Sequence, residues 1–440
     1  MSALFHRTCD ANLPWAESGD GCYIIDRHGK RYLDACGGAA ISCLGHSDEA
    51  VKTAIRDQLE KLPFAHTSFF TTEAAETFAD LLISKAPAGL NRVYPVSGGS
   101  EAIEAALKLA RQYFLERGEP QRTRLIARHQ SYHGATLGAL SAGGNAWRRE
   151  AFAPLMIETS HISPCFEYRG RAEGETPLSY GLRMADELEH ELQRVGPETV
   201  IAFIAEPVVG ASLGAVPAAP GYFKRIREIC DRHGVLLILD EVMCGMGRTG
   251  TLFACEQDGI VPDIVTIAKG LGAGYQPVGA MLCSAELHDT IAAGSGFFQH
   301  GHSYLGHPMA MAAATAVLRR LTDGETLRHV AHMGDMLRAR LQDVFGQHPN
   351  IGDIRGRGLF IGVELVNDRE TKTPFDPSLN LHKRVKSAAM DAGLMCYPMG
   401  GTIDGRQGDH ILLAPPFILS ADQTGELVDK LSQAIGAALP

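Results

Sequence analysis

Five polar or glycine-rich segments each stand directly after a short apolar run of the sequence. They are 97–101 (SGGSE), 129–134 (HQSYHG), Glu206, Asp240 and Lys269. Ligands of open α/β sheets bind at the carboxyl ends of the strands, so groups that follow several parallel strands meet at one edge of the sheet. A lysine, two carboxylates and a glycine-rich turn at that edge would form a site for covalent and acid–base chemistry.

Two of these segments have a specific chemical use. The glycine-rich turn runs into a helical pattern, so the N–H groups of Gly99 and Ser100 and the Ser100 hydroxyl can hold a phosphate at the positive helix end. The alternative is a tight turn with a serine N-cap. Lys269 stands between an apolar run and three glycines, where a desolvated lysine can lose its proton and form a Schiff base. The alternative is a lysine that extends from a strand end into solvent.

The apolar runs alternate with helical patterns, which predicts an α/β fold with a mainly parallel sheet. Between the first two runs, residues 100–114 place apolar side chains at helical intervals and predict an amphipathic helix. The expected strands are 92–96, 124–127, 199–205, 235–239 and 263–268.

The residue pattern changes near residue 325, where long, charged helical segments begin. We therefore expect a large domain over 61–325 and a smaller α+β domain over 326–440, with strands at 358–365 and 410–415. The N-terminal segment, 1–60, alternates like a small antiparallel sheet around GCYIIDRHGKRYLDA, and we expect it to pack with the small domain.

Composition limits the class of protein. The chain has 440 residues, 45% of them hydrophobic, and a formal net charge of −10, which argues against a nucleic-acid or anionic-membrane partner. No apolar stretch reaches the roughly 18 to 20 residues of a membrane span, and the N-terminus has no apolar signal core. The ten cysteines are scattered singly, as in reduced thiols, so we expect a cytoplasmic protein.

Lys269, Asp240 and the glycine-rich turn together fit one cofactor chemistry. An aldehyde cofactor with a pyridine ring needs a lysine for the Schiff base, a carboxylate that keeps the ring nitrogen protonated, and a phosphate cradle. The chain resembles the class-III (omega-amino-acid type) aminotransferases, fold-type-I enzymes that depend on pyridoxal 5′-phosphate (PLP). The resemblance runs in the family's order through 29–46, 98–111, 131–136, 202–210, 236–250, 266–280, 300–308 and 355–365.

The resemblance implies a role for each polar group at the cofactor. Lys269 would bind PLP as a Schiff base and act as general base and acid, and Asp240 would pair with the pyridinium nitrogen. Val242 and Tyr132 would lie against the two faces of the ring, and Glu206 would lie near the ring.

The remaining expected cofactor contacts lie in three motifs. Gly99 and Ser100 would hold the phosphate, although Gly98 stands where many relatives have a serine. His133 belongs to the same motif as Tyr132. Ser303 stands where the family commonly has a threonine that reaches the phosphate of the neighbouring subunit, which implies a homodimer with shared active sites.

Two positions are expected to contact substrate. Ala39 and Ala40 stand where several omega-transaminases have a bulky aromatic residue, so Ala40 implies a roomier pocket. Arg406 is the candidate for a mobile arginine that binds a substrate carboxylate, and Arg357 is the second candidate. Both arginines could equally be solvated loop charges.

The expected activity is transfer of an amino group from a primary amine, omega-amino acid or amino acid to a 2-oxo acid, pyruvate or 2-oxoglutarate, by a ping-pong mechanism. The alternative within the family is a PLP-dependent lyase, such as an amino-alcohol phosphate phospho-lyase. Fold alone does not determine the substrate, the pathway or any assembly larger than a dimer, and pocket shape decides the substrate.

Two further motifs favour other classes of site. Gly245, Gly247 and Gly250 have the spacing of a dinucleotide loop, but a carboxylate separates them from the strand, so we expect only a turn. Histidines at 129 and 133, and at 300, 302 and 307, could suggest a metal. They lack the Glu of H-E-x-x-H and a clustered carboxylate or cysteine, so no metal site is expected.

Overall fold

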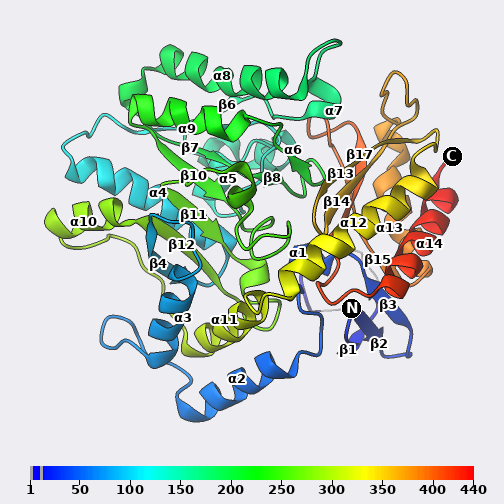
Figure 1. The fold of residues 1–440 in the computed structure, drawn as a ribbon, viewed down its shortest axis with the longest axis horizontal. Coiled ribbons are helices and arrows are strands. Elements are labelled where there is room, and N and C mark those ends of the chain that lie inside the picture. Colours follow the sequence, from blue (N-terminus) through cyan, green and yellow to red (C-terminus); the bar gives the residue numbers. More distant parts are fainter. Residues whose placement is uncertain (1–2, 10–12) are drawn as a thin grey trace.

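The computed structural model describes residues 3–9 and 13–440; residues 1–2 and 10–12 of the expected N-terminal segment lie outside this part. Its largest sheet has seven strands among the described residues, and only β12 runs against its neighbours (Figure 1). The sheet is therefore mainly parallel, as predicted. In spatial order the strands are β4 (Leu90–Val96), β12 (Gly279–Ser284), β11 (Ile264–Ile267), β10 (Leu236–Asp240), β7 (Val200–Ala205), β5 (Arg124–Arg128) and β6 (Thr159–Ile162).

All five expected strands of this sheet form, whereas β6 and β12 were not expected. β6 is a short, polar edge strand, and β12 begins directly after a glycine-rich loop, so neither has a long apolar run that stands out in the sequence. The central strands β7 and β10 are buried at every residue. Helices on both faces explain this burial, because a parallel sheet needs both of its faces covered.

Alternate residues of β10 belong to two different hydrophobic clusters. Ile238 packs with apolar residues of α4 (Gly99–Glu116) on one face. Leu237 and Leu239 belong to the cluster that includes α8 (Pro177–Val195) and α9 (Tyr222–His233) on the other face. The α4 helix corresponds to the one predicted over 100–114, and its first turn lies at the end of β4.

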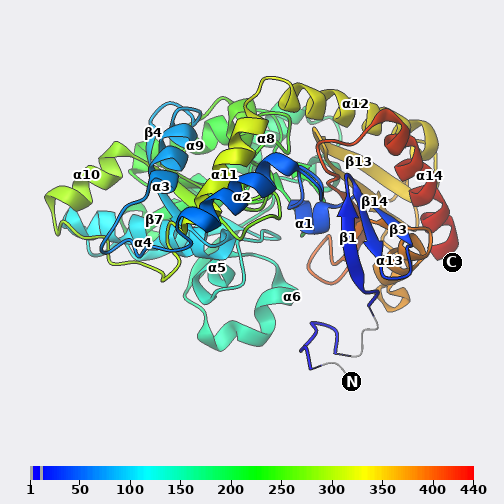
Figure 2. The same ribbon diagram turned by 90° about the horizontal axis from the view of Figure 1, so that it is seen from below.

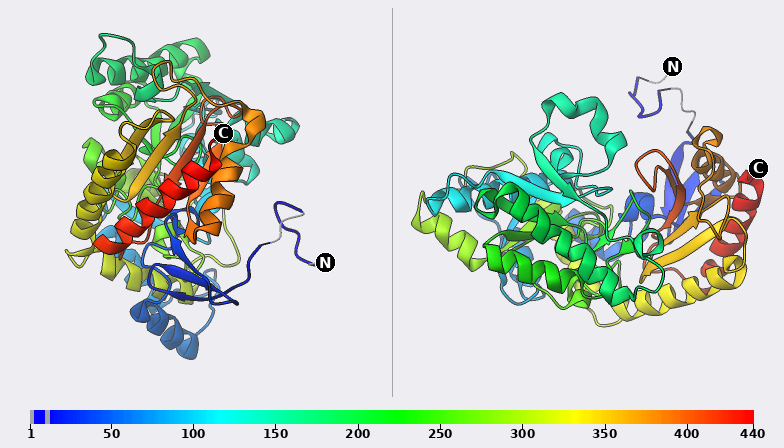
Figure 3. Two further views of the ribbon diagram at one scale, coloured as in Figure 1. Left: turned by 90° about the vertical axis from the view of Figure 1, so that its right-hand side faces the viewer. Right: turned by 90° about the horizontal axis from the view of Figure 1, so that it is seen from above.

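A second lobe follows the long helix α12 (Thr326–Phe345). Its antiparallel sheet has the order β13 (Ile351–Arg357), β14 (Phe360–Leu365), β17 (Asp409–Leu413) and β16 (Tyr397–Gly400). The helices α13 (Leu381–Asp391) and α14 (Ala421–Ala438) pack beside it (Figure 3). Strands β14 and β17 lie where the sequence predicts them, and β13 was not expected.

The N-terminal strands form a sheet together with a C-terminal strand (Figure 1), and they lie beside the second lobe (Figure 2). The order is β1 (Ala16–Asp20), β2 (Tyr23–Asp26), β3 (Arg31–Asp34) and β15 (Leu394–Met395), with β3 and β15 parallel. Segments from the two ends of the chain are thus hydrogen-bonded neighbours. The domain boundaries near 60 and 325 stay a prediction.

The remaining elements connect these layers. α2 and α3 pack against α11, next to the large sheet. No helix in the described part of the chain is long and apolar enough to span a bilayer. The elements are α1 (Gly37–Ala40), α2 (Glu49–Lys61), α3 (Glu73–Ile83), α5 (Leu137–Ala142), α6 (Ala146–Arg149), α7 (Glu167–Gly170), β8 (Val208–Val209), β9 (Val216–Pro217), α10 (Ala285–Ala293) and α11 (Pro308–Leu321).

Candidate active site

A cavity of about 270 Å³ lies at the carboxyl ends of the parallel strands. Eight of the predicted site residues line it, and they come from five separate segments of the chain. Ile41, Gly210, Ala211 and Val278 also line it and were not among the predicted residues. The eight are Gly99, Ser100, Tyr132, His133, Glu206, Asp240, Val242 and Lys269.

Asp240 is the last residue of β10, and its carboxylate is buried and oriented by two donors. His133 Nδ1 lies 2.8 Å from Asp240 Oδ2, and the Val242 N–H donates to Oδ1 at 3.0 Å. Because an ionised carboxylate only accepts, the proton of this pair lies on His133 Nδ1. His133 Nε2 is buried and has no partner among the described residues. No pattern in the sequence indicates that His133 orients Asp240.

Lys269 follows β11 in a left-handed backbone conformation, with φ +45°. Such a conformation costs about 1–3 kcal/mol for a residue other than glycine and is retained where the surroundings require it. Burial lowers the pKa of the Lys269 ammonium, and the nearby carboxylates of Asp240 and Glu206 oppose that shift. The neutral amine, which is the nucleophilic form, is thereby favoured.

The first turn of α4 forms a cradle that excludes side chains. A Cβ atom at Gly99 would lie 2.6 Å from Val242 Cγ1, and one at Gly134 would lie 2.6 Å from Ser100 Oγ. Ser100 Oγ accepts from the Ala135 N–H at 3.0 Å, so its own proton is free to donate. The first N–H groups of a helix have no partner within it, so this turn can bind an anion.

Glu206 anchors the turn that carries Tyr132. Its Oε1 accepts from the Tyr132 N–H at 3.1 Å, and its Oε2 lies 3.7 Å from the Arg128 guanidinium. Burial raises the pKa of the Glu206 carboxyl. The ring of Tyr132 borders the cavity, and the guanidinium of Arg148 lies 4.6 Å from the ring centroid.

Arg406 and Arg357 do not line the cavity. The Arg406 side chain is 69% exposed and lies 3.3 Å from the Glu150 carboxylate. Arg357 makes two 3.1 Å hydrogen bonds with Asp258, which tie it to the interface between the lobes.

Ala40 and Ser303 also lie outside the cavity lining. Ala40 is buried at φ +63° in an apolar cluster with Phe360 and Leu412, while its neighbour Ile41 borders the cavity. Ser303 is exposed on the loop that precedes α11. Neither residue expected to contact substrate, Arg406 or Ala40, lines the cavity, and Ser303 is the one expected cofactor contact that does not line it.

The glycine motif after Asp240 is a series of turns and opens no helix. Gly247 and Gly250 have φ values of +90° and +96°. Between them, the buried Arg248 donates to the carbonyls of Leu359 and Pro415 at 3.1 and 2.6 Å. The motif therefore joins the large sheet to the second lobe, which agrees with the prediction of a turn.

The chain matches the aminotransferase class-III family over residues 7–435. An uncharacterized aminotransferase of Schizosaccharomyces pombe is 45% identical, covering 99% of this chain and 96% of that protein. A thermostable (S)-enantioselective omega-transaminase from Thermomicrobium roseum has a TM-score of 0.92 and 35% identity, covering 98% of this chain and 94% of that one. An omega-transaminase from Pseudomonas jessenii in complex with PMP has a TM-score of 0.91 and 33% identity, covering 96% of this chain and 92% of that one.

The chain therefore belongs to the class-III aminotransferase family, with fold type I, and the resemblance seen in the sequence is confirmed. It is a PLP-dependent aminotransferase whose substrates are an amine donor and an oxo-acid acceptor. The residues of the cavity fit this cofactor. The cradle at Gly99 suits a phosphate, Asp240 suits a protonated ring nitrogen, and Lys269 suits an aldehyde.

Proposed function

We propose that this enzyme transfers an amino group from a primary amine, omega-amino acid or amino acid to pyruvate or 2-oxoglutarate by a ping-pong mechanism. One observation carries the proposal. The cavity that is lined by the first turn of α4 also contains Lys269, whose pKa is lowered, and an Asp240 carboxylate held by His133.

The cavity residues hold the cofactor in distinct ways. The first-turn amides of Gly99 and Ser100 would bind its phosphate, and the Asp240 carboxylate would accept a hydrogen bond from its protonated ring nitrogen. Val242 and Tyr132 would lie against the two ring faces, and Glu206 fixes the Tyr132 turn. When bound, PLP supplies a carbonyl carbon that exchanges oxygen for the substrate nitrogen and a conjugated ring that withdraws electrons from the broken C–H bond.

Lys269 moves the proton of the reaction. Its Nζ takes the proton from the carbon that bears the donor's nitrogen, and in the second half-reaction it delivers a proton to C2 of the oxo acid. Burial makes the neutral amine available for the first transfer. His133 keeps the Asp240 carboxylate in one orientation throughout, which avoids reorganisation during the reaction.

A homodimer with shared active sites is part of this proposal. The ring centroid of Phe64 lies 6.0 Å from those of Tyr304 and His307. Phe69 and Phe70, which follow in the chain, are exposed. An exposed aromatic patch of this kind is typical of an interaction surface. Ser303 lies in the same loop as Tyr304, so a second copy docked on this patch would cover the loop with the residue that the family resemblance relates to the neighbouring subunit's phosphate.

We also propose a cytoplasmic location. All ten cysteines are free thiols, and nine of them are buried. Such thiols suit a reducing compartment.

The test is the visible absorption of the purified holoenzyme while a panel of amines is added without an oxo acid, with ammonia and phosphate assayed in parallel. We expect the cofactor band to change with the reactive amine and to recover when pyruvate or 2-oxoglutarate is added. A band that persists while ammonia or phosphate accumulates would instead establish the lyase reaction.

A further inference from the structure

Gln130 occupies a strained position two residues before Tyr132. The residue is 4% exposed and has φ +57°, a left-handed conformation that is uncommon for glutamine. Its backbone N–H donates to the Gly144 carbonyl at 3.1 Å, and its own carbonyl accepts from the Ser212 hydroxyl. Such strain persists only where the surrounding contacts require it.

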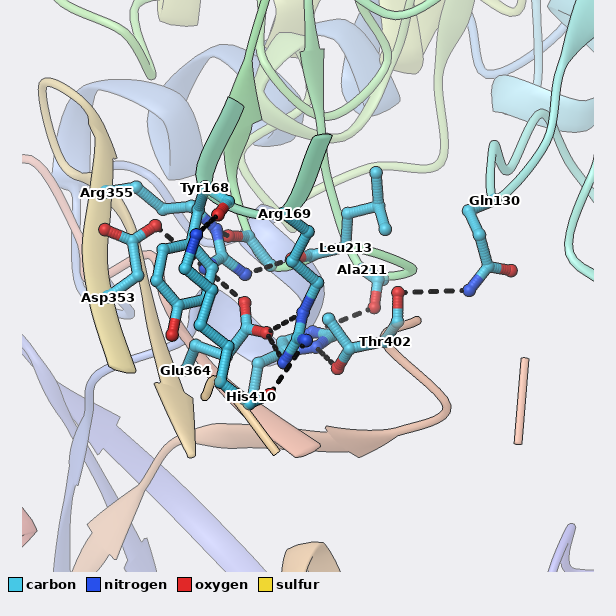
Figure 4. A network of polar contacts seen from close by, with 12 residues as sticks. Gln130, Tyr168, Arg169, Ala211, Leu213, Asp353, Arg355, Glu364, Thr402 and His410 are labelled. Carbon is cyan, nitrogen blue, oxygen red and sulfur yellow. Dashed lines mark hydrogen bonds and ion pairs between the residues drawn. The ribbon is translucent and has the colours of Figure 1, made fainter. Parts of the chain in front are cut away.

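The side-chain amide of Gln130 holds the base of the 401–408 loop. Its Nε2 donates to the carbonyls of Gly401 and Thr402 at 2.7 and 3.1 Å, and its Oε1 accepts from Asn145 Nδ2 at 3.0 Å. Figure 4 shows the amide directed at this loop from outside the second lobe. Both N–H groups and the oxygen of the amide are therefore engaged.

Thr402 is also held from the opposite side (Figure 4). His410 Nε2 lies 3.1 Å from the Ala211 carbonyl, which only accepts, so Nε2 carries the proton. His410 Nδ1 must then accept from the Thr402 hydroxyl at 2.7 Å. Ala211 borders the cofactor cavity, so the chain of bonds runs from the cavity wall to the loop.

The segment that faces the loop depends on the same glutamine. Asn145, which bonds Gln130, also caps α6 by accepting from the Arg148 N–H at 3.3 Å. Glu150, the first residue after α6, pairs with Arg406 of the loop. Gln130 thus contacts both segments joined by this ion pair, the 401–408 loop and the residue that caps α6, while the Arg406 side chain itself is 69% exposed.

We propose that Gln130 is a positioning residue that fixes the base of the 401–408 loop and thereby sets the enzyme's preference for substrates that carry a carboxylate. This inference rests on the proposed function and on the expectation from the sequence that Arg406 of the loop binds that carboxylate. Gln130 acts through the loop and touches no substrate atom.

Two variants separate this role from general folding. Gln130→Asn keeps the amide and a residue type that tolerates the left-handed conformation, but it is one methylene too short to reach the loop. Gln130→Glu keeps the length and the acceptor for Asn145, but it removes both N–H donors. Gln257→Glu is the matched control, because Gln257 Nε2 likewise bridges two acceptors, the Thr249 carbonyl at 2.8 Å and the Thr251 hydroxyl at 3.2 Å. Its neighbour Asp258 pairs with Arg357 at the end of β13 opposite the 401–408 loop.

Two readouts are measured on the holoenzyme. The first is amide hydrogen exchange of the peptide that spans 401–408, where the Gly401 N–H donates to Gly408 and the Ile403 N–H donates to Gln407. The second is the ratio of kcat/KM for pyruvate to kcat/KM for acetaldehyde, which differs from pyruvate only in lacking the carboxylate. We expect faster exchange and a ratio lowered about tenfold in both Gln130 variants, and neither change in the control.

Unchanged exchange would overturn the proposal, and so would faster exchange with an unchanged ratio. If the wild-type enzyme transfers nitrogen yet shows no preference for pyruvate over acetaldehyde, the carboxylate role of the loop fails while the aminotransferase assignment stands. If the wild-type enzyme transfers no nitrogen to pyruvate, 2-oxoglutarate or acetaldehyde, the proposed function itself fails.

Discussion

The two ends of the cavity are built differently. At the cofactor end, Asp240 and Lys269 follow adjacent parallel strands and are surrounded by buried partners. At the substrate end, Arg406 lies on an exposed loop and Ala40 lies outside the cavity lining. A sheet edge fixes the reacting groups before any ligand arrives, whereas loops are free to adapt to the ligand. The groups that determine the reaction class are therefore held more rigidly than those expected to select the substrate.

The largest loss of activity is expected for Lys269→Ala, at the rigid cofactor end. We expect turnover to fall at least about 10³-fold, because the nucleophile and the proton carrier are lost together, while the cradle at Gly99 still binds the cofactor. Single-turnover absorbance with an amine measures the loss. Lys372→Ala is the matched control, since Lys372 is also a left-handed lysine, at φ +57°, but lies in the second lobe. Comparable loss in both variants would contradict the assignment of Lys269.

Asp240→Asn tests the second rigid group. The amide keeps the shape but cannot hold a proton on the ring nitrogen, so we expect kcat to fall about 10²- to 10³-fold. Steady-state kinetics with saturating amine measures it. Asp263→Asn serves as the control, because Asp263 precedes β11 at the opposite edge of the sheet and pairs with Arg227 at 2.8 Å. A kcat within threefold of wild type for Asp240→Asn would remove this residue from the mechanism.

At the adaptable end, Arg406→Ala should leave the chemistry intact. We expect KM for the 2-oxo acid to rise about tenfold with little change in kcat, since one charge-assisted contact is lost. Glu150→Ala, which removes the exposed partner of Arg406, is expected to leave KM nearly unchanged. An equal increase in KM for acetaldehyde would show that Arg406 does not bind the carboxylate of the 2-oxo acid.

The smallest expected effect concerns Glu241, which follows Asp240. Its carboxylate accepts from the N–H groups of Ala254 and Cys255 at 2.6 and 2.8 Å, and burial raises its pKa to about 7. The folded state then binds more protons than the unfolded state between about pH 4.5 and 7, so this group's contribution to stability is lost as pH rises through that window. We expect Glu241→Gln to flatten the pH dependence of thermal unfolding there. An unchanged slope would contradict it.

The sequence predicts the rigid end of the cavity well for a physical reason. A strand that is buried on both faces reads as an apolar run, and the polar residue that ends it, such as Asp240 or Lys269, stands out. The bond from His133 to Asp240 joins residues 107 positions apart, and no local pattern indicates it. Gln130 shows the same limit, because its importance comes from the distant 401–408 loop. The dispersed positions of Arg406 and Ala40 likewise depend on how loops pack, which periodicity does not describe.

The parallel pairing of β3 with β15 has a consequence for synthesis of the chain. Asp34 pairs with Met395, so the N-terminal sheet cannot be completed until about 360 further residues have been synthesised. At roughly 5–20 residues per second, this synthesis takes roughly 20–70 s. During that interval the large sheet, whose strands all lie between the two partners, can be completed. Vectorial folding of this enzyme would therefore proceed from the middle outward, and its two ends would be the last parts to close.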